Sequence, residues 1–240
     1  MIISNSSPTE NCAESIFSFL KNNASQPTLL FWSGGSASKI AELLVPKLNN
    51  FDDLSWLTMS LIDERYGQPG HADSNETLIR TNGLIDLVEK KSGQWFPVLT
   101  GLPIEQEIDR MNSFFTSNYT QPTKKLGLFG IGEDGHTAGM LPVFDDSTPF
   151  DSLFSPATNE VYSFFNLNQV NPNYPNPFKE RMTLNMNGIK NLDERVVFAS
   201  GEKKKSVLKK INQSSTSIHL CPAKIFSEVP SHLFTDQNLS

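Results

Sequence analysis

The run Leu126-Gly-Leu-Phe-Gly-Ile-Gly-Glu-Asp-Gly-His-Thr-Ala-Gly-Met-Leu-Pro142 decides how this chain folds. It begins as an apolar, strand-like segment and then breaks into glycines, two acids and a histidine. The glycines permit backbone conformations that residues with a Cβ resist, so the chain can turn sharply where the strand ends. In α/β proteins, ligands bind at the carboxyl ends of the strands. The run therefore predicts an α/β fold that presents Asp134 and His136 to a crevice.

On both sides of this run, apolar segments alternate with segments of helical periodicity, the pattern of βα units around a parallel sheet. Besides the strand that ends at Ile131, strands are predicted at residues 28–32, 56–62, 195–200 and 216–220. Helices are predicted at residues 39–48, 75–88, 104–119 and 203–211. Residues 166–179 are rich in Asn and Pro, which predicts a long surface loop beside the site. We expect one α/β domain over residues 1–240, with a mainly parallel, twisted sheet flanked by helices in a Rossmann-like arrangement.

Composition restricts the classes of protein and partner. Only 38% of the 240 residues are hydrophobic, and no apolar run approaches the roughly 20 residues of a membrane-spanning helix. The first residues lack a charged and then apolar leader, and two cysteines are too few for a disulfide scaffold. The formal net charge of -6 argues against general nucleic-acid binding. We expect a cytoplasmic protein without a membrane or nucleic-acid partner.

Three further polar clusters follow predicted strands or open predicted helices. Gly34-Gly35-Ser36 lies at a helix start, where free backbone N–H groups attract anions, although an ordinary helix cap has the same pattern. Asp63-Glu64-Arg65 closes one strand, and Asp73-Ser74-Asn75 caps a helix that contains Arg80; a solvated patch of ion pairs is the alternative. Lys203-Lys204-Lys205 opens another helix, where cations are unfavourable unless an anion shares the site. The clusters predict a binding site for an anion.

Four blocks of this sequence, in order, resemble the 6-phosphogluconolactonase family, within the superfamily that includes glucosamine-6-phosphate isomerase/deaminase. They are Trp32-Ser-Gly-Gly-Ser36, Asp63-Glu-Arg65 with Asp73-Ser-Asn75 and Arg80, Gly130-Ile-Gly-Glu-Asp-Gly-His-Thr-Ala138 with Pro142, and Arg181-Met-Thr-Leu184 with Gly201-Glu-Lys-Lys204. Deaminases typically have a tyrosine after the Asp-Glu pair, where this chain has Arg65. The chain departs from the family pattern at Ser36-Ala37-Ser38, where Ser-Thr-Pro is usual.

The resemblance implies a carboxylic ester hydrolase that opens 6-phospho-D-glucono-1,5-lactone to 6-phospho-D-gluconate, the second step of the oxidative pentose phosphate pathway, without a metal or a cofactor. It also implies that Arg181 and Lys204 bind the substrate phosphate. Gly34, Gly35, Ser36 and Arg80 are further candidates for that role.

Lactone hydrolysis itself requires a base for water, donors for the oxyanion and a proton for the leaving oxygen. His136, with an ordinary pKa of ~6.5, suits the base, and either Asp134 or Asp63 would orient it. Either Arg65 or backbone N–H groups of the glycine turn would hold the oxyanion. The other histidines, at positions 71, 219 and 232, show no metal-ligand spacing.

Two other functions use the same residues. An isomerase or deaminase would use Asp63 as the proton shuttle on an amino-sugar phosphate. A sugar-phosphate sensor without catalysis would keep Arg181 and Lys204 but has little reason to keep His136 in a glycine-rich turn. We expect a sugar-phosphate lactone as the ligand and a monomer or small homo-oligomer as the assembly.

Overall fold

The structure, a computed structural model, describes residues 1–4, 6–35, 38–120 and 123–239. Its main feature is a seven-stranded sheet in which every neighbouring pair of strands is parallel. Across the sheet the order is β1 (Ile2–Ser4), β10 (His232–Phe234), β9 (Glu194–Phe198), β6 (Lys124–Gly130), β2 (Thr28–Trp32), β3 (Leu57–Leu61) and β5 (Gln94–Trp95). The mainly parallel sheet predicted from the sequence is confirmed.

A second, antiparallel sheet of three strands was not predicted. It consists of β4 (Asp63–Arg65), β8 (Glu180–Leu184) and β7 (Tyr162–Asn166). Ile62 joins the two sheets, since its N–H donates to the Trp32 carbonyl at 2.8 Å and its carbonyl accepts from Leu184 N–H at 2.7 Å. Asp63 therefore lies where the chain leaves the large sheet.

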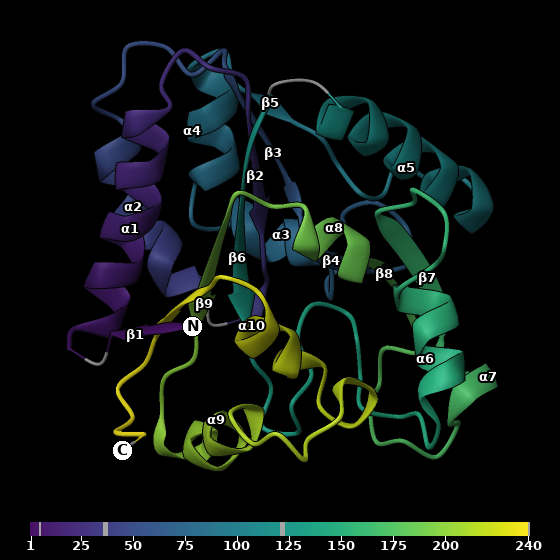
Figure 1. Ribbon diagram of the computed structural model, residues 1–240. Helices are drawn as coiled ribbons and strands as arrows, with labels where there is room; N and C mark the ends of the chain where they lie inside the picture. Colours follow the sequence, from purple (N-terminus) through teal and green to yellow (C-terminus); the bar gives the residue numbers. More distant parts are fainter. Residues whose placement is uncertain (5, 36–37, 121–122, 240) are drawn as a thin grey trace.

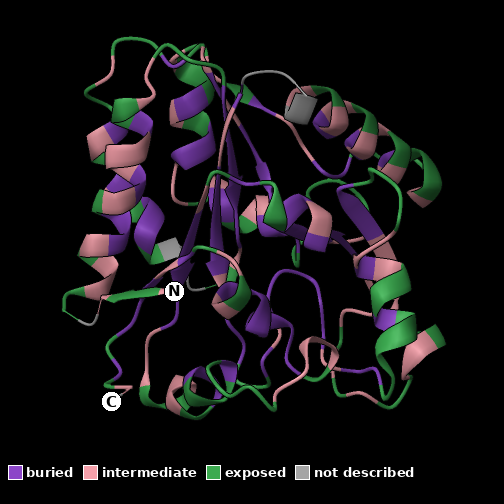
Figure 2. Ribbon diagram, viewed as in Figure 1, coloured by how far each residue is buried: buried purple, intermediate pink, exposed green. Residues whose placement is uncertain are grey.

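Helices cover both faces of the large sheet (Figure 1). On one side lie α1 (Pro8–Asn22), α2 (Ser38–Leu48) and α4 (Leu84–Lys90), and on the other lie α5 (Ile104–Thr120), α8 (Met186–Lys190) and α10 (Ile225–Glu228). The remaining helices are α3 (Asn75–Arg80), α6 (Ser147–Phe154), α7 (Leu167–Val170) and α9 (Lys205–Ile211), with short 3-10 turns at η2 (Glu202–Lys204), η3 (Ile218–Leu220) and η4 (Pro222–Lys224). The central strands β2, β3, β6 and β9 are largely buried between these layers, whereas β1 at the edge of the sheet is exposed (Figure 2).

One aromatic side chain of α5 links the two sheets. The Phe115 ring lies 4.8 Å from the Phe31 ring of β2 and 5.9 Å from the Tyr162 ring of β7, measured between centroids. The Tyr162 hydroxyl in turn donates to the Leu61 carbonyl at 2.6 Å. The small sheet is thus fixed against the end of the large one by buried contacts.

Several predicted elements differ from the structure. Residues 75–88 form two helices because the chain turns at Gly83, with φ of 72°. The strand predicted at 216–220 is wrong: this segment contains a 3-10 turn, and β10 occupies the edge of β9 instead. The predicted loop at 166–179 contains the four-residue helix α7, which Asn166 caps.

Candidate active site

A cavity of about 300 Å³ lies at the carboxyl ends of β2, β6 and β9, next to β4. This is a switch point of the sheet, because the chain runs from β2 to β3 on one side and later returns to β6 on the other. The cavity is lined by Ser33, Gly34, Gly35, Asp63, Arg65, Asn75, Gly130, Ile131, Gly132, His136, Ala138, Arg181, Ser200 and Lys204. Residues from six separate segments of the sequence therefore meet here.

A larger cavity, of about 710 Å³, lies at the amino ends of β9 and β10, beside Met1 and His232. Its acidic lining residues include Asp193, Glu194 and Glu228. Among the described residues, no arginine or lysine lines this larger cavity. We place the candidate active site in the smaller cavity, where cations and a histidine converge.

The glycine-rich turn after β6 carries His136 into the cavity. Gly132 N–H donates to the His136 carbonyl at 2.8 Å, and Thr137 Oγ1 donates to the Gly130 carbonyl at 2.8 Å, so the turn closes on itself. A Cβ at position 132 would lie 2.1 Å from His136 Nδ1. Only glycine leaves room for the imidazole to fold back over the turn, which explains the glycine at this position.

The carboxylate of Asp134 contacts the imidazole of His136. Asp134 Oδ1 lies 2.6 Å from His136 Nδ1 and accepts the His136 backbone N–H at 3.1 Å. Asp134 Oδ2 accepts a hydrogen bond from the Tyr174 hydroxyl. Burial raises the pKa of Asp134, but the bonds from His136 and Tyr174 outweigh it and hold this pKa well below its ordinary value.

An ionised Asp134 has only acceptor atoms, so the neutral imidazole carries its proton on Nδ1 and leaves Nε2 as an acceptor. Of the two acids considered for orienting His136, Asp134 is the one in contact with it. Asp63 instead lies beside Arg181, with Oδ2 at 3.5 Å from Arg181 Nη1.

Two arginines occupy directly opposed positions on β4 and β8. Arg65 and Arg181 are register partners in this antiparallel pair, an arrangement that is unfavourable for like charges. Arg181 is only 5% exposed, and burial lowers its pKa while Asp63 opposes the shift. Within the described part of the chain, the buried Nε of each arginine has no hydrogen-bond acceptor. An anionic ligand in the cavity would relieve the repulsion between the two guanidinium groups.

Lys204, in η2, is the third cation that lines the cavity. Burial lowers its pKa, and the acids Glu133 and Asp134 oppose that shift. The next lysine toward the N-terminus, Lys203, is exposed and lies 3.9 Å from Glu133. The lysine cluster identified in the sequence thus contributes one side chain to the cavity, Lys204.

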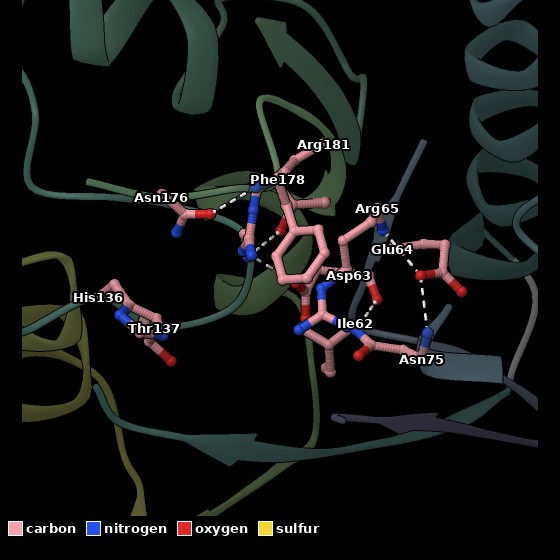
Figure 3. Close-up of polar contacts among 12 residues, drawn as sticks. Ile62, Asp63, Glu64, Arg65, Asn75, His136, Thr137, Asn176, Phe178 and Arg181 are labelled. Atoms are coloured by element: carbon pink, nitrogen blue, oxygen red, sulfur yellow. Dashed lines mark hydrogen bonds and ion pairs between the residues drawn. The ribbon is translucent and has the colours of Figure 1, made fainter. Parts of the chain in front are cut away.

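Glu64 supports the site without lining it. Its buried carboxylate accepts from Ser74 Oγ at 2.7 Å and from Asn75 N–H at 2.8 Å, which fixes the start of α3. Asn75 Nδ2 then donates to the Asp63 carbonyl at 2.8 Å. Figure 3 shows this group on one side of Asp63 and His136 on the other. Burial raises the pKa of Glu64 despite these hydrogen bonds.

The structure brings most of the predicted site residues together. Gly34, Gly35, Asp63, Arg65, His136, Arg181 and Lys204 line the cavity, and Asp134 contacts His136. Ser36 and the neighbouring Ala37 lie outside the described residues.

Arg80 is the predicted site residue that the structure places elsewhere. Its guanidinium pairs with Glu76 at 3.0 Å, Asp86 at 3.2 Å and Glu89 at 3.3 Å. It does not line the cavity, because α3 directs it toward the acids of α3 and α4. These ion pairs fit the alternative interpretation, a patch of ion pairs.

Sequence reasoning missed Asn75, Ser200 and Tyr174. Asn75 was recognised as part of a helix cap and of a block of the family resemblance, but not as a residue of the cavity that it lines. Ser200 is the last residue of the strand predicted at 195–200 and lies just after β9, so its position at a strand end was an available signal. Tyr174 lies in an irregular segment, and no local pattern distinguishes it.

A family model described as "Glucosamine-6-phosphate isomerases/6-phosphogluconolactonase" matches residues 5–234. The chain belongs to this family. The Helicobacter pylori strain J99 protein named 6-phosphogluconolactonase is 27% identical over 193 residues, which cover 78% of this chain and 75% of the relative. The Dictyostelium discoideum protein named "Probable 6-phosphogluconolactonase" is 28% identical over 217 residues, or 84% and 81% of the two chains.

Solved structures of both branches of the family share the fold. A 6-phosphogluconolactonase from Shewanella baltica superposes with a TM-score of 0.75 and 21% identity, over 98% of this chain and 96% of that one. A monomeric glucosamine-6-phosphate deaminase superposes with a TM-score of 0.71 and 17% identity, over 98% and 97%. The similar scores show that the fold alone does not separate the two activities.

Proposed function

We propose that this chain hydrolyses 6-phospho-D-glucono-1,5-lactone to 6-phospho-D-gluconate. The observation that carries the proposal is the Asp134–His136 pair beside a cavity lined by Arg65, Arg181 and Lys204. A histidine base and a cluster of cations are the two features that hydrolysis of a phosphorylated lactone requires. The names of the relatives support the same activity.

In the proposed mechanism, His136 Nε2 takes a proton from water as the water oxygen attacks C1 of the lactone. The carbonyl electrons move to the oxygen and form a tetrahedral oxyanion. When the carbonyl re-forms, the bond between C1 and the ring oxygen breaks, and the imidazolium returns its proton to that oxygen. Asp134 stabilises the imidazolium in between. Water is consumed and the acid is formed without another reactant.

The cations have separate roles in this proposal. Arg181 and Lys204 bind the phosphate, Arg181 with its guanidinium fork and Lys204 as a point charge. The oxyanion has two sets of candidate donors in the cavity, the Arg65 guanidinium and the backbone N–H groups of the turn that begins at Gly130. Asp63 keeps Arg181 in place through its contact at 3.5 Å.

The decisive experiment compares the wild-type protein with His136→Ala on freshly prepared lactone, with spontaneous ring opening subtracted. We expect kcat to fall by about two to four orders of magnitude in the variant, the usual size of a general-base contribution. The unfolding temperature of both proteins controls for misfolding. Full activity in a folded His136→Ala protein would remove His136 from the mechanism, and no wild-type turnover would remove the proposed reaction.

The deaminase reaction is the second candidate, because the Asp63 carboxylate that it would use lies in the same cavity. A coupled assay for ammonia release from glucosamine 6-phosphate distinguishes it from the lactonase. We expect no release above background, since the sequence has Arg65 where deaminases typically have a tyrosine. Ammonia release without lactone hydrolysis would favour the deaminase, and binding without either reaction would favour the sensor.

We also propose a cytoplasmic location, where thiols stay reduced. Cys12 and Cys221 are both buried and unpaired, as is usual in a reducing compartment. Among the described residues, no helix is both long and apolar enough to cross a bilayer. Cell fractionation tests this location, and recovery in an oxidising compartment would contradict it. Light scattering would test the proposed monomer or small homo-oligomer.

A further inference from the structure

A tyrosine from the long loop between β7 and β8 reaches the carboxylate that holds His136. Tyr174 donates its hydroxyl proton to Asp134 Oδ2, across 40 positions of sequence. The tyrosine is partly buried, in a loop whose residues alternate between exposed and partly buried. It belongs neither to the glycine turn nor to any of the sequence blocks that carry the family resemblance.

The loop that carries Tyr174 is fixed at both ends. Asn166 and Glu180 are register partners in β7 and β8, and Leu167 N–H donates to the Lys179 carbonyl at 2.6 Å. Lys179 Nζ donates to the Tyr174 carbonyl at 3.0 Å, inside the loop. These bonds hold the tyrosine at a defined distance from the small sheet.

The same loop makes a second contact with the site. The ring of Phe178 lies 4.5 Å from Arg65 Cζ, a distance at which a guanidinium is attracted to an aromatic face. Figure 3 shows Phe178 in front of the residues of β4. The loop therefore contacts both halves of the cavity, the glycine turn through Tyr174 and the small sheet through Phe178.

We propose that Tyr174 is a positioning residue for catalysis, acting on His136 through Asp134. This inference rests on the proposed function for its kinetic consequence. Asp134 Oδ1 binds the imidazole and Oδ2 binds the phenol, so the carboxylate is held from two sides and rotates less freely. With the carboxylate fixed, the imidazole keeps its proton on Nδ1 and directs Nε2 toward the cavity.

The electrostatic surroundings keep the phenol protonated, as this role requires. Burial and the neighbouring carboxylate of Asp134 raise the pKa of Tyr174, and Arg181 acts in the opposite direction. The Lys179 ammonium is bound to the carbonyl of the same residue. The phenol is therefore a hydrogen-bond donor to Asp134 throughout the neutral pH range.

A double-mutant cycle tests whether Tyr174 acts through Asp134. We expect Tyr174→Phe to lower kcat about tenfold with KM changed less than about twofold, because a hydrogen bond to a charged group is lost. In an Asp134→Ala background, the same substitution should change kcat by less than about twofold, since the acceptor is gone. Equal losses in the two backgrounds, or no loss in the first, would overturn the proposal.

Tyr66→Phe is the matched control. It also removes one tyrosine hydroxyl, but that hydroxyl donates to the Leu102 carbonyl at 3.2 Å and does not contact Asp134. We expect its kcat to stay within about twofold of the wild type. A loss equal to that of Tyr174→Phe would mean that any missing phenol in this region disturbs activity, which would also overturn the proposal.

A spectroscopic measurement separates this inference from the proposed function. The ¹⁵N signals of the His136 ring, assigned by their absence in His136→Ala, report which nitrogen carries the proton. We expect the Nδ1-protonated form to dominate in the wild type and a mixture of both forms in Tyr174→Phe. This holds whether or not the lactone is the substrate. An unchanged ring spectrum in Tyr174→Phe would refute the positioning role even if lactone hydrolysis is confirmed.

Discussion

At the scale of single residues, the opposed arginines are the clearest indication of what the cavity binds. Arg65 and Arg181 face each other across β4 and β8, and both have a buried Nε without an acceptor in the described part of the chain. A protein that keeps two cations in this arrangement has an energetic reason to bind an anion there. The Asp63 carboxylate contacts Arg181 at 3.5 Å, and the neighbouring Glu64 carboxylate accepts hydrogen bonds from Ser74 and Asn75.

Removing the buried guanidinium should weaken substrate binding. We expect Arg181→Ala to raise KM about tenfold to hundredfold, because charged hydrogen bonds contribute about 1.5–3 kcal/mol each. Arg80→Ala is the matched control, since Arg80 pairs with acids outside the cavity, and its KM should stay within about twofold. Steady-state kinetics on the lactone measures both. An unchanged KM in Arg181→Ala would place the phosphate elsewhere.

At the scale of elements, the turn after β6 determines where the base lies. Gly132 and His136 are in contact across the turn, and Gly135 has a φ of 95°, which residues with a side chain seldom adopt. The turn is closed by bonds between its own backbone groups and by Thr137. The backbone of the turn therefore fixes the position of His136, and Asp134 orients its imidazole ring.

A methyl group in this turn should displace the base. We expect Gly132→Ala to lower kcat at least tenfold, because its Cβ would lie 2.1 Å from His136 Nδ1 and the imidazole must rotate away from Asp134. Gly130→Ala is the matched control for adding a methyl group to the same turn, since its Cβ would meet no atom of the described residues within 4 Å. At saturating lactone, an equal fall of kcat in both variants would argue against displacement of His136.

At the scale of the whole molecule, two sheets share one layer of buried aromatic residues, and α5 contacts both. The carboxyl ends of the parallel strands and the start of the antiparallel sheet thereby meet in one cavity. That residues 1–240 form a single domain stays a prediction. Helix α5 is also bonded to the loop that precedes it, through a carboxylate. We expect the free energy of unfolding to depend on pH through this contact.

The buried carboxylate of Glu107 in α5 should make folding sensitive to acid. It accepts from Thr100 Oγ1 at 3.0 Å and Arg110 Nη2 at 2.7 Å, so although burial raises its pKa, these donors bring the pKa below its ordinary value. The pKa of a glutamate in the unfolded chain is about 4.3. A carboxylate whose pKa is lower in the folded protein stabilises the fold at pH values above about 4.3, and this stabilisation is lost as the pH falls through its folded pKa.

We expect Glu107→Gln to lower the free energy of unfolding by about 1.5–3 kcal/mol at pH 7, and by less below about pH 4. Urea unfolding at several pH values measures this difference. Glu105→Gln, on the exposed side of the same helix, is the control and should change stability by less than about 0.5 kcal/mol. A difference between Glu107→Gln and the wild type that does not depend on pH would contradict the assignment.

Local patterns in the amino-acid sequence were enough to predict several features of the fold and the site. Apolar runs and helical periodicity predicted five strands, of which four are in the large sheet, because burial on both faces of a parallel sheet leaves a local pattern. The glycines around Asp134 and His136 indicated a turn with chemistry at a strand end. The helix cap at Ser74 was also readable, since its hydroxyl bonds to a group only three residues away.

Which distant residues come into contact became evident from the folded chain. The fold placed Arg80 outside the cavity lining, against the acids of α4, and it placed Arg181 opposite Arg65 through an antiparallel sheet that no local pattern indicated. In the folded chain β10 pairs with β9, whereas residues 216–220 do not form a strand. The Tyr174 hydroxyl also contacts the Asp134 carboxylate. Each of these outcomes depends on contacts between segments far apart in sequence, and local periodicity carries no information about such pairing.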